Sequence, residues 1–149
     1  MSDKIYGDGA FRRPGLMGST VENTYAGALS FMRRNYTRNL EGAEIVFVAY
    51  GSTSRIAMEA MEMLADEGIK VGLIRPKTLW PFPKKELCEA TKHASHILDV
   101  EMSMGQMIDD VRLATECRLP VSFFGRTGGV IPTPAEVLAE IEKLAGGAE

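Results

Sequence analysis

From residue 44 onward, the chain alternates short apolar runs with stretches whose apolar residues recur at helical spacing. The apolar runs predict strands at 45–50, 69–74, 96–101 and 119–124. The stretches between and after them predict helices: one that ends at Gly68, then 83–92, 105–116 and a last one that begins at Thr133. Continuous apolar strands are typical of a sheet that is covered on both faces. The alternation therefore predicts an α/β fold, an open, mostly parallel twisted sheet with helices on both faces.

The first 40 residues follow a different pattern. Residues 1–18 are rich in Gly, Arg and Pro and have no periodicity, which is typical of an extended arm. Ser19 and Glu22 have the spacing of a capping box and predict the start of a helix, at whose end Arg33, Arg34 and Arg38 gather. We therefore divide the chain into an N-terminal arm and connector helix, 1–40, and an α/β domain, 41–149.

Composition excludes several classes of function. A net charge of -3 gives no global support for nucleic-acid binding. The N-terminus has no signal-peptide pattern, and no stretch approaches the roughly 20 apolar residues of a membrane helix, so we expect a cytoplasmic location. Cys88 and Cys117 stand far apart and predict reduced thiols. An iron–sulfur cluster needs about four clustered thiolates, which this chain cannot supply.

Two further patterns bear on cofactor and metal chemistry. Gly7-Asp8-Gly9 has the letters that begin a thiamine-diphosphate motif, but no apolar strand precedes them, so a flexible arm is favoured. His93 and His96 are expected on different elements, which does not make a metal site. No catalytic residue is predicted, because the spacing reveals neither paired carboxylates nor an activated nucleophile.

In a sheet of this kind, functional groups gather at the carboxyl ends of the strands. After the first strand come Gly51, Ser52, Thr53 and Ser54, at the expected start of a helix. Backbone N–H groups at such a start can hold an anion, which makes these four residues candidates for anion binding. The alternative is that the hydroxyl side chains only cap the helix.

The run from Arg75 to Pro83 follows the second strand and is stiffened by three prolines. Trp80 and Phe82 present large apolar faces beside the charge of Arg75, a combination typical of anchors at protein interfaces. The alternative is that the loop packs both aromatic rings against its own domain.

The turn Glu101-Met102-Ser103-Met104-Gly105-Gln106 follows the third strand. The carboxylate of Glu101 and the amide of Gln106 could bind a partner chain or a ligand there. The alternative is a simple connection between strand and helix, with methionines that fill the core. Together with Arg75, Trp80 and Phe82, these two residues form the predicted subunit interface.

Several segments, in this order, resemble the α chain of 2-oxoacid:ferredoxin oxidoreductases. They are Val48-Ala49-Tyr50-Gly51-Ser52, the strand from Gly68 to Pro76, Leu79-Trp80-Pro81-Phe82-Pro83, Val100 to Gln106, and Gly128-Gly129 to Pro134. The resemblance covers about residues 44–144 and identifies this part as the transketolase-type C-terminal domain of that chain. A full α chain of the family carries a further domain before this one.

The resemblance implies oxidative decarboxylation of a 2-oxoacid to an acyl-CoA, with electrons passed to ferredoxin. It implies thiamine diphosphate, magnesium, iron–sulfur clusters and coenzyme A for the whole complex, and none of them on this chain. It further implies a thiamine-binding chain and an iron–sulfur chain as partners, assembly as a dimer or higher, and no activity of this chain alone.

The sequence leaves two other functions open beside the ferredoxin-dependent enzyme, which is the first interpretation. The same domain occurs in other thiamine enzymes, such as transketolase or the β chain of a 2-oxoacid dehydrogenase, and fold alone does not separate them. The third interpretation is a stand-alone α/β module that binds an anion at Gly51–Ser54.

Overall fold

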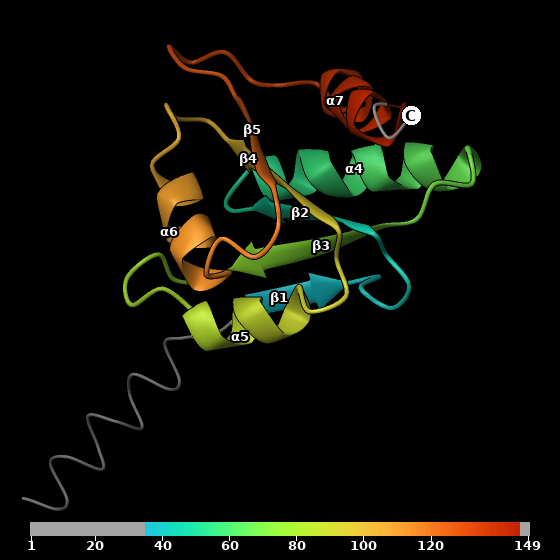
Figure 1. Ribbon diagram of the computed structural model, residues 1–149. Coiled ribbons are helices and arrows are strands. Elements are labelled where there is room, and N and C mark those ends of the chain that lie inside the picture. The colour runs from blue at the N-terminus through green and yellow to red at the C-terminus, as the bar shows by residue number, and fades with distance from the viewer. Residues whose placement is uncertain (1–34, 147–149) are drawn as a thin grey trace, which may run out of the picture. The chain divides into compact units, whose positions relative to one another are not determined.

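The computed structural model describes residues 35–146, which form a five-stranded sheet with helices on both faces (Figure 1). The strands are β1 (Asn35–Arg38), β2 (Ile45–Ala49), β3 (Val71–Pro76), β4 (His96–Glu101) and β5 (Val121–Gly125). The helices are α4 (Thr53–Asp66), α5 (Lys84–Ala90), α6 (Met107–Ala114) and α7 (Pro134–Gly146). The predicted arm, most of the predicted connector helix and the Gly7-Asp8-Gly9 segment lie outside the described residues.

The strand order is β1-β3-β2-β4-β5, and every pair is parallel except β1 with β3. The chain moves outward from β2 to β3 and then crosses back over β2 to β4. The strand order therefore reverses between β2 and β4, the position at which sheets of this class usually bind ligands. The predicted mostly parallel α/β sheet is confirmed.

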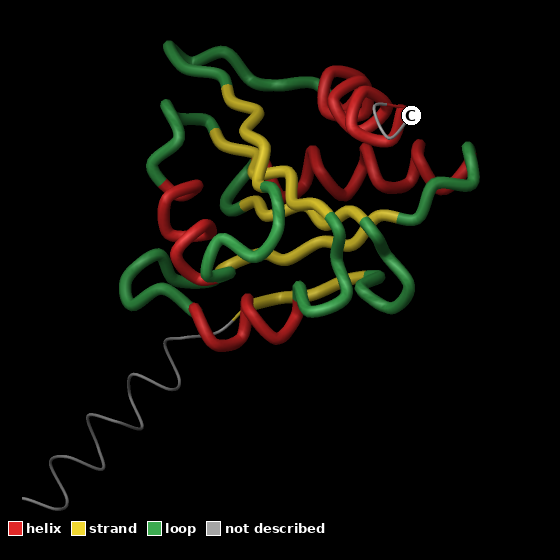
Figure 2. Tube along the Cα trace, in the orientation of Figure 1, coloured by secondary structure: helices red, strands yellow, loops and turns green. Residues whose placement is uncertain are grey.

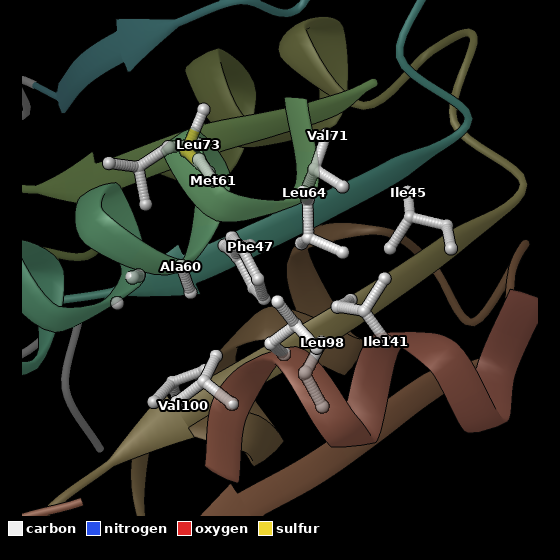
Figure 3. Packing of buried hydrophobic residues seen from close by; sticks show 14 of the residues in the cluster. Ile45, Phe47, Ala60, Met61, Leu64, Val71, Leu73, Leu98, Val100 and Ile141 are labelled. Atoms are coloured by element: carbon white, nitrogen blue, oxygen red, sulfur yellow. The ribbon is translucent and has the colours of Figure 1, made fainter. Parts of the chain in front are cut away.

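The sheet lies between two apolar layers. On one face, α4 and α7 pack over β2, β3 and β4; Phe47 and Leu98 are buried there against Leu64 and Ile141 (Figure 3). On the other face, α5 and α6 cover Val46, Val48 and Ile97. Alternate residues of β2 therefore enter opposite layers, which explains its continuous apolar sequence.

One strand was missed, and it corrects the predicted end of the connector helix. Residues Asn35–Arg38 form the antiparallel edge strand β1, with Tyr36 opposite Arg75 and Asn35 opposite Pro76. Arg38 therefore lies in a strand, where it pairs with Glu62 of α4 at 3.4 Å. Tyr36 and Thr37 favour a strand, but four residues are too few to show an alternating pattern, and the pairing of β1 with β3 is a contact between distant residues.

The predicted end of the second strand at residue 74 is also corrected, since β3 runs through Pro76. Pro76 is the last residue of the strand, where the missing N–H removes no bond from the interior of the sheet. The predicted helix stop at Gly68 is confirmed by its positive φ of 82°. The predicted helix start at Thr133 is confirmed too, and a capping box forms it: Thr133 N–H donates to Glu136 at 2.8 Å, and Glu136 N–H donates to the Thr133 hydroxyl at 3.3 Å.

Candidate functional site

The loops that follow β3, β4 and β5 all lie at the same end of the sheet, where the parallel strands have their carboxyl ends (Figures 1 and 2). The turn from Gly51 to Ser54, which follows β2, reaches the same edge. The structure thus gathers the candidate segments of the sequence at one end of the domain. Their side chains nevertheless take very different positions.

Neither Thr53 nor Ser54 caps the helix that begins there. Both are buried, and their hydroxyls donate backward to the carbonyls of Tyr50 at 2.6 Å and Gly51 at 2.7 Å. Ser52 is the N-cap residue, and no side chain accepts a bond from the first turn of α4. Its own hydroxyl contacts the sulfur of Met102 at 3.4 Å, across the point where the strand order reverses. The start of α4 therefore keeps its positive end uncapped by protein side chains.

The structure brings Gly51 and Arg75 to the same pocket, of about 470 Å³, at the ends of β2 and β3. Its lining residues are Tyr36, Tyr50, Gly51, Arg75, Pro76, Lys77 and Leu79. The turn predicted to bind an anion, at Gly51, and the positive charge of Arg75 thus line the same pocket. The contributions of Tyr36 and Tyr50 were not predicted, because only the register of β1 and β2 puts them there.

The two aromatic residues of the proline-rich loop separate. Trp80 is 88% exposed, whereas Phe82 is 6% exposed and packs in the core cluster with Leu87. The loop is held in part by a hydrogen bond from the Thr78 hydroxyl to the carbonyl of Pro81, at 3.0 Å. The exposed ring of Trp80 thus remains available to a partner, as the interface interpretation expects. Phe82 instead packs against its own domain, as the alternative interpretation expects.

Glu101 is fully buried and acts within the chain. Its carboxylate accepts the N–H groups of Met107 at 3.0 Å and Ile108 at 3.1 Å, at the start of α6, and the Ser103 hydroxyl at 2.5 Å. Gln106 is exposed, and its side-chain oxygen accepts the Met104 N–H at 3.1 Å. In this structure, the carboxylate expected to face a partner instead caps a helix.

Asp99 is a buried acid that the sequence analysis did not single out. It lies two residues before Glu101 on β4, so both side chains enter the same face of the sheet. Burial, then a hydrogen bond with Glu101 and the negative charge of that residue, together raise the pKa of Asp99 to about 10, against a smaller lowering by Arg112. As a carboxylate, Asp99 has no donor for either oxygen within residues 35–146; as a neutral acid it donates to Glu101.

The pKa of Glu101 moves the other way. Burial alone would raise it, but the hydrogen bonds from Asp99, Ser103, Met107 and Ile108 together lower it. One proton thus resides on Asp99, and the negative charge resides on Glu101 at the positive end of α6. An acid at an inward position of an apolar strand is the signal that could have identified this pair.

The carboxyl ends of the strands also carry exposed apolar side chains, here named the carboxyl-end rim. Its members come from the loops after β3, β4 and β5 and are Leu79, Trp80, Met102, Met104, Val130 and Ile131. Met104 is 77% exposed and Ile131 is 63% exposed. Large apolar groups concentrated at one end are typical of a protein interface.

The remaining titratable candidates show no metal-binding arrangement. His93 is exposed, while His96 is hydrogen-bonded through Nε2 to the Ser122 hydroxyl at 2.8 Å. Within the described part of the chain, no three His, Cys, Asp or Glu side chains are grouped as metal ligands. Cys88 and Cys117 are free thiols, and no helix among residues 35–146 is both long and apolar enough to span a membrane.

Comparison with known proteins places the chain in a family. The family model "Pyruvate:ferredoxin oxidoreductase core domain II" matches residues 43–137. Ketoisovalerate oxidoreductase subunit VorB of Methanothermobacter marburgensis is 43% identical over 107 residues, which are 72% of this chain and 30% of VorB. The chain therefore spans less than a third of the length of this relative.

Two solved structures share the fold. One is 2-oxoglutarate:ferredoxin oxidoreductase from Magnetococcus marinus with 2-oxoglutarate, coenzyme A and succinyl-CoA bound; its TM-score is 0.71 at 23% identity, over 88% of this chain and 24% of that one. The other is a split-gene transketolase, an inactive β4 tetramer, with a TM-score of 0.64 at 22% identity, over 75% of this chain and 41% of that one. The predicted transketolase-like fold is confirmed by both.

Proposed function

Because the chain belongs to the pyruvate:ferredoxin oxidoreductase core domain II family, we propose that it is one domain of a 2-oxoacid:ferredoxin oxidoreductase. The complete enzyme would decarboxylate a 2-oxoacid oxidatively, transfer the acyl group to coenzyme A and pass two electrons to ferredoxin. The match over residues 43–137, on a fold shared with a 2-oxoglutarate:ferredoxin oxidoreductase, is the observation that carries this proposal.

The chemistry of that reaction is assigned to other parts of the complex. Thiamine diphosphate and iron–sulfur clusters would supply carbanion stabilisation and electron transfer when bound. The described residues do not fit an iron–sulfur cluster, since they offer only two separated thiols. They do not fit the metal ion of thiamine diphosphate either, since no three metal-ligating side chains are grouped among them. We therefore assign no catalytic step to this domain, and we propose a cytoplasmic complex in which both thiols stay reduced.

Within the complex, we propose that the carboxyl-end rim contacts another subunit. Trp80 is the strongest anchor of the rim, because it exposes a large apolar ring on a loop stiffened by prolines. Gln106 lies at the same end and offers an exposed amide. Phe82 and Glu101 support this surface from within the domain. Phe82 packs in the core under the proline-rich loop, and Glu101 accepts a hydrogen bond from the first turn of α6.

The transketolase interpretation has weaker support. The split-gene transketolase shows likeness of fold alone, at 22% identity, whereas the family model and VorB both point to 2-oxoacid oxidoreductases. A stand-alone module is not favoured either, because an isolated domain has no evident use for an exposed apolar rim.

Co-purification tests the proposal. An affinity-tagged form of the full chain should recover a thiamine-binding chain and an iron–sulfur chain from its native extract, identified by mass spectrometry. The recovered complex should reduce ferredoxin only when a 2-oxoacid and coenzyme A are both present. Recovery of the tagged chain alone, without partners, contradicts the proposal.

The interface is tested by Trp80→Ala in the same assay, with Met63→Ala as the matched control. Met63 is another exposed apolar residue, but it lies on α4, outside the rim. Trp80→Ala should lower the recovery of partners by about tenfold or more, as expected for an interface anchor. Equal recovery with Trp80→Ala and with Met63→Ala would remove the rim from the interface.

A further inference from the structure

The pocket beside Gly51 and Arg75 has an unusual charge. Arg75 and Lys77 both line it, and no aspartate or glutamate does. Within the described residues, neither cation pairs with a carboxylate. Other cations there are unpaired as well, namely Arg55, Lys70, Lys84, Lys85 and Arg118, but none of these lines this pocket. Two unpaired cations therefore line one pocket in a chain whose net charge is -3.

The adjoining helix adds to this positive charge. Gly51, in the wall of the pocket, leads directly into α4, whose first turn contains no acid and includes Arg55. The first turns of α5, α6 and α7 each contain an acid, which is the favourable arrangement at the positive end of a helix. At α4 the first turn has a cation in place of an acid, so no protein carboxylate balances that end.

The remaining walls are suited to an organic ligand. Tyr36 lies directly opposite Arg75 in the β1–β3 register, and Tyr50 follows β2, so that two phenol groups accompany the cations. A tyrosine offers a flat apolar face together with a hydroxyl that donates a hydrogen bond. The volume of about 470 Å³ lies within the range of about 300–1,000 Å³ that is usual for small-molecule sites.

We propose that this pocket binds the phosphate group of a phosphorylated small molecule. Arg75 and Lys77 supply two positive charges, and the guanidinium of Arg75 can donate two parallel hydrogen bonds to phosphate oxygens. Gly51 in the pocket wall leads into α4, so the positive end of that helix lies near the pocket and favours an anion there. A single carboxylate would balance only one of the two charges and would fill little of the volume.

This proposal does not rest on the assembly proposal, although Leu79 belongs both to the carboxyl-end rim and to the pocket. Its test uses the full 149-residue chain without partners. Pyrophosphate is titrated into the chain labelled with nitrogen-15, with sodium chloride added to the reference sample to match ionic strength. Saturable shifts are expected for the amide signals of residues 51–54, near the pocket. Shifts that do not saturate, or that sodium chloride reproduces, overturn the proposal.

A pair of double variants separates a specific site from general attraction. Arg75→Gln with Lys77→Gln removes both pocket cations, while Lys84→Gln with Lys85→Gln removes the same charge from exposed positions on α5. The pocket variant should raise the Kd for pyrophosphate by about tenfold or more, as expected when charge-assisted hydrogen bonds are lost. The α5 variant should leave the Kd unchanged.

Equal weakening in both double variants overturns the proposal in favour of non-specific attraction. If the pocket variant fails to fold, which its circular dichroism spectrum would show, the amide shifts of the unmodified chain still decide. Failure to bind pyrophosphate leaves the co-purification result untouched, and failure of co-purification leaves pyrophosphate binding untouched. Each proposal is therefore tested by a measurement of its own.

Discussion

The carboxylate of Glu101 accepts the backbone N–H of Met107 at 3.0 Å, so that the end of β4 caps the start of α6. The same carboxylate accepts the Ile108 N–H at 3.1 Å. A single buried side chain thus satisfies two donors that a helix start leaves without partners. This contact fixes the turn that presents Met104 and Gln106 at the carboxyl-end rim.

Replacing Glu101 should therefore destabilise the fold. Glu101→Ala leaves two buried N–H groups without acceptors and should lower the free energy of unfolding by about 2–3 kcal/mol. Glu101→Gln keeps an acceptor oxygen and should cost about 1 kcal/mol. Urea unfolding followed by circular dichroism measures both values. Equal losses in the two variants would show that the cap contributes through its charge alone.

The buried acid Asp99 makes the stability dependent on pH. Its pKa is raised from an ordinary value of 3.8 to about 10, so between these values the folded state holds a proton that the unfolded state has released. The free energy of unfolding should therefore decrease as pH rises, by at most about 1.4 kcal/mol per pH unit from this group. Asp99→Asn removes this titration and still donates a hydrogen bond to Glu101.

The comparison of Asp99→Asn with the unmodified chain is made from about pH 6 to about pH 8, by urea unfolding. The variant should become the more stable of the two as pH rises, because it no longer binds the proton in question. A constant difference between the two chains over this range would show that Asp99 does not titrate there.

Glu136 should give an effect of opposite sign at acid pH. Hydrogen bonds from the Thr133 backbone and from Arg126 and the Thr133 hydroxyl lower its pKa to about 2. Its contribution to stability is complete above the ordinary pKa of 4.5 and is lost as pH falls toward 2. Glu136→Gln should therefore have a lower thermal midpoint than the unmodified chain at neutral pH.

The two thermal midpoints should converge as the pH falls toward about 2, where the unmodified side chain is also neutral. Glu142→Gln, at an exposed position of α7, removes the same charge and serves as the control. If Glu142→Gln lowered the thermal midpoint at neutral pH as much as Glu136→Gln does, the effect would come from net charge and not from the hydrogen bonds of Glu136.

Truncation of Phe82 should cost far more stability than truncation of Trp80. Phe82→Ala opens a cavity in the core and should cost about 3–5 kcal/mol of unfolding free energy, measured in urea. Trp80→Ala changes an 88% exposed side chain and should cost no more than about 0.5 kcal/mol. A large loss with Trp80→Ala would mean that its ring contributes to the fold itself.

The sequence by itself determined the class of fold. Apolar runs of strand length alternate with helical periodicity, and each such segment must bury its apolar side, so a layered α/β sheet follows. It also determined local features, such as the capping box of Thr133 and Glu136 and the left-handed stop at Gly68. These depend only on residues close together along the chain.

Only the tertiary structure decided which side chains meet. The edge strand β1 exists through its hydrogen bonds with β3, and its register puts Tyr36 beside Arg75. Burial of Glu101 depends on the position of α6, and the pocket at Gly51 depends on the ends of two strands. Such contacts join residues distant in sequence, and a local pattern carries no information about the register, burial or neighbours that create them.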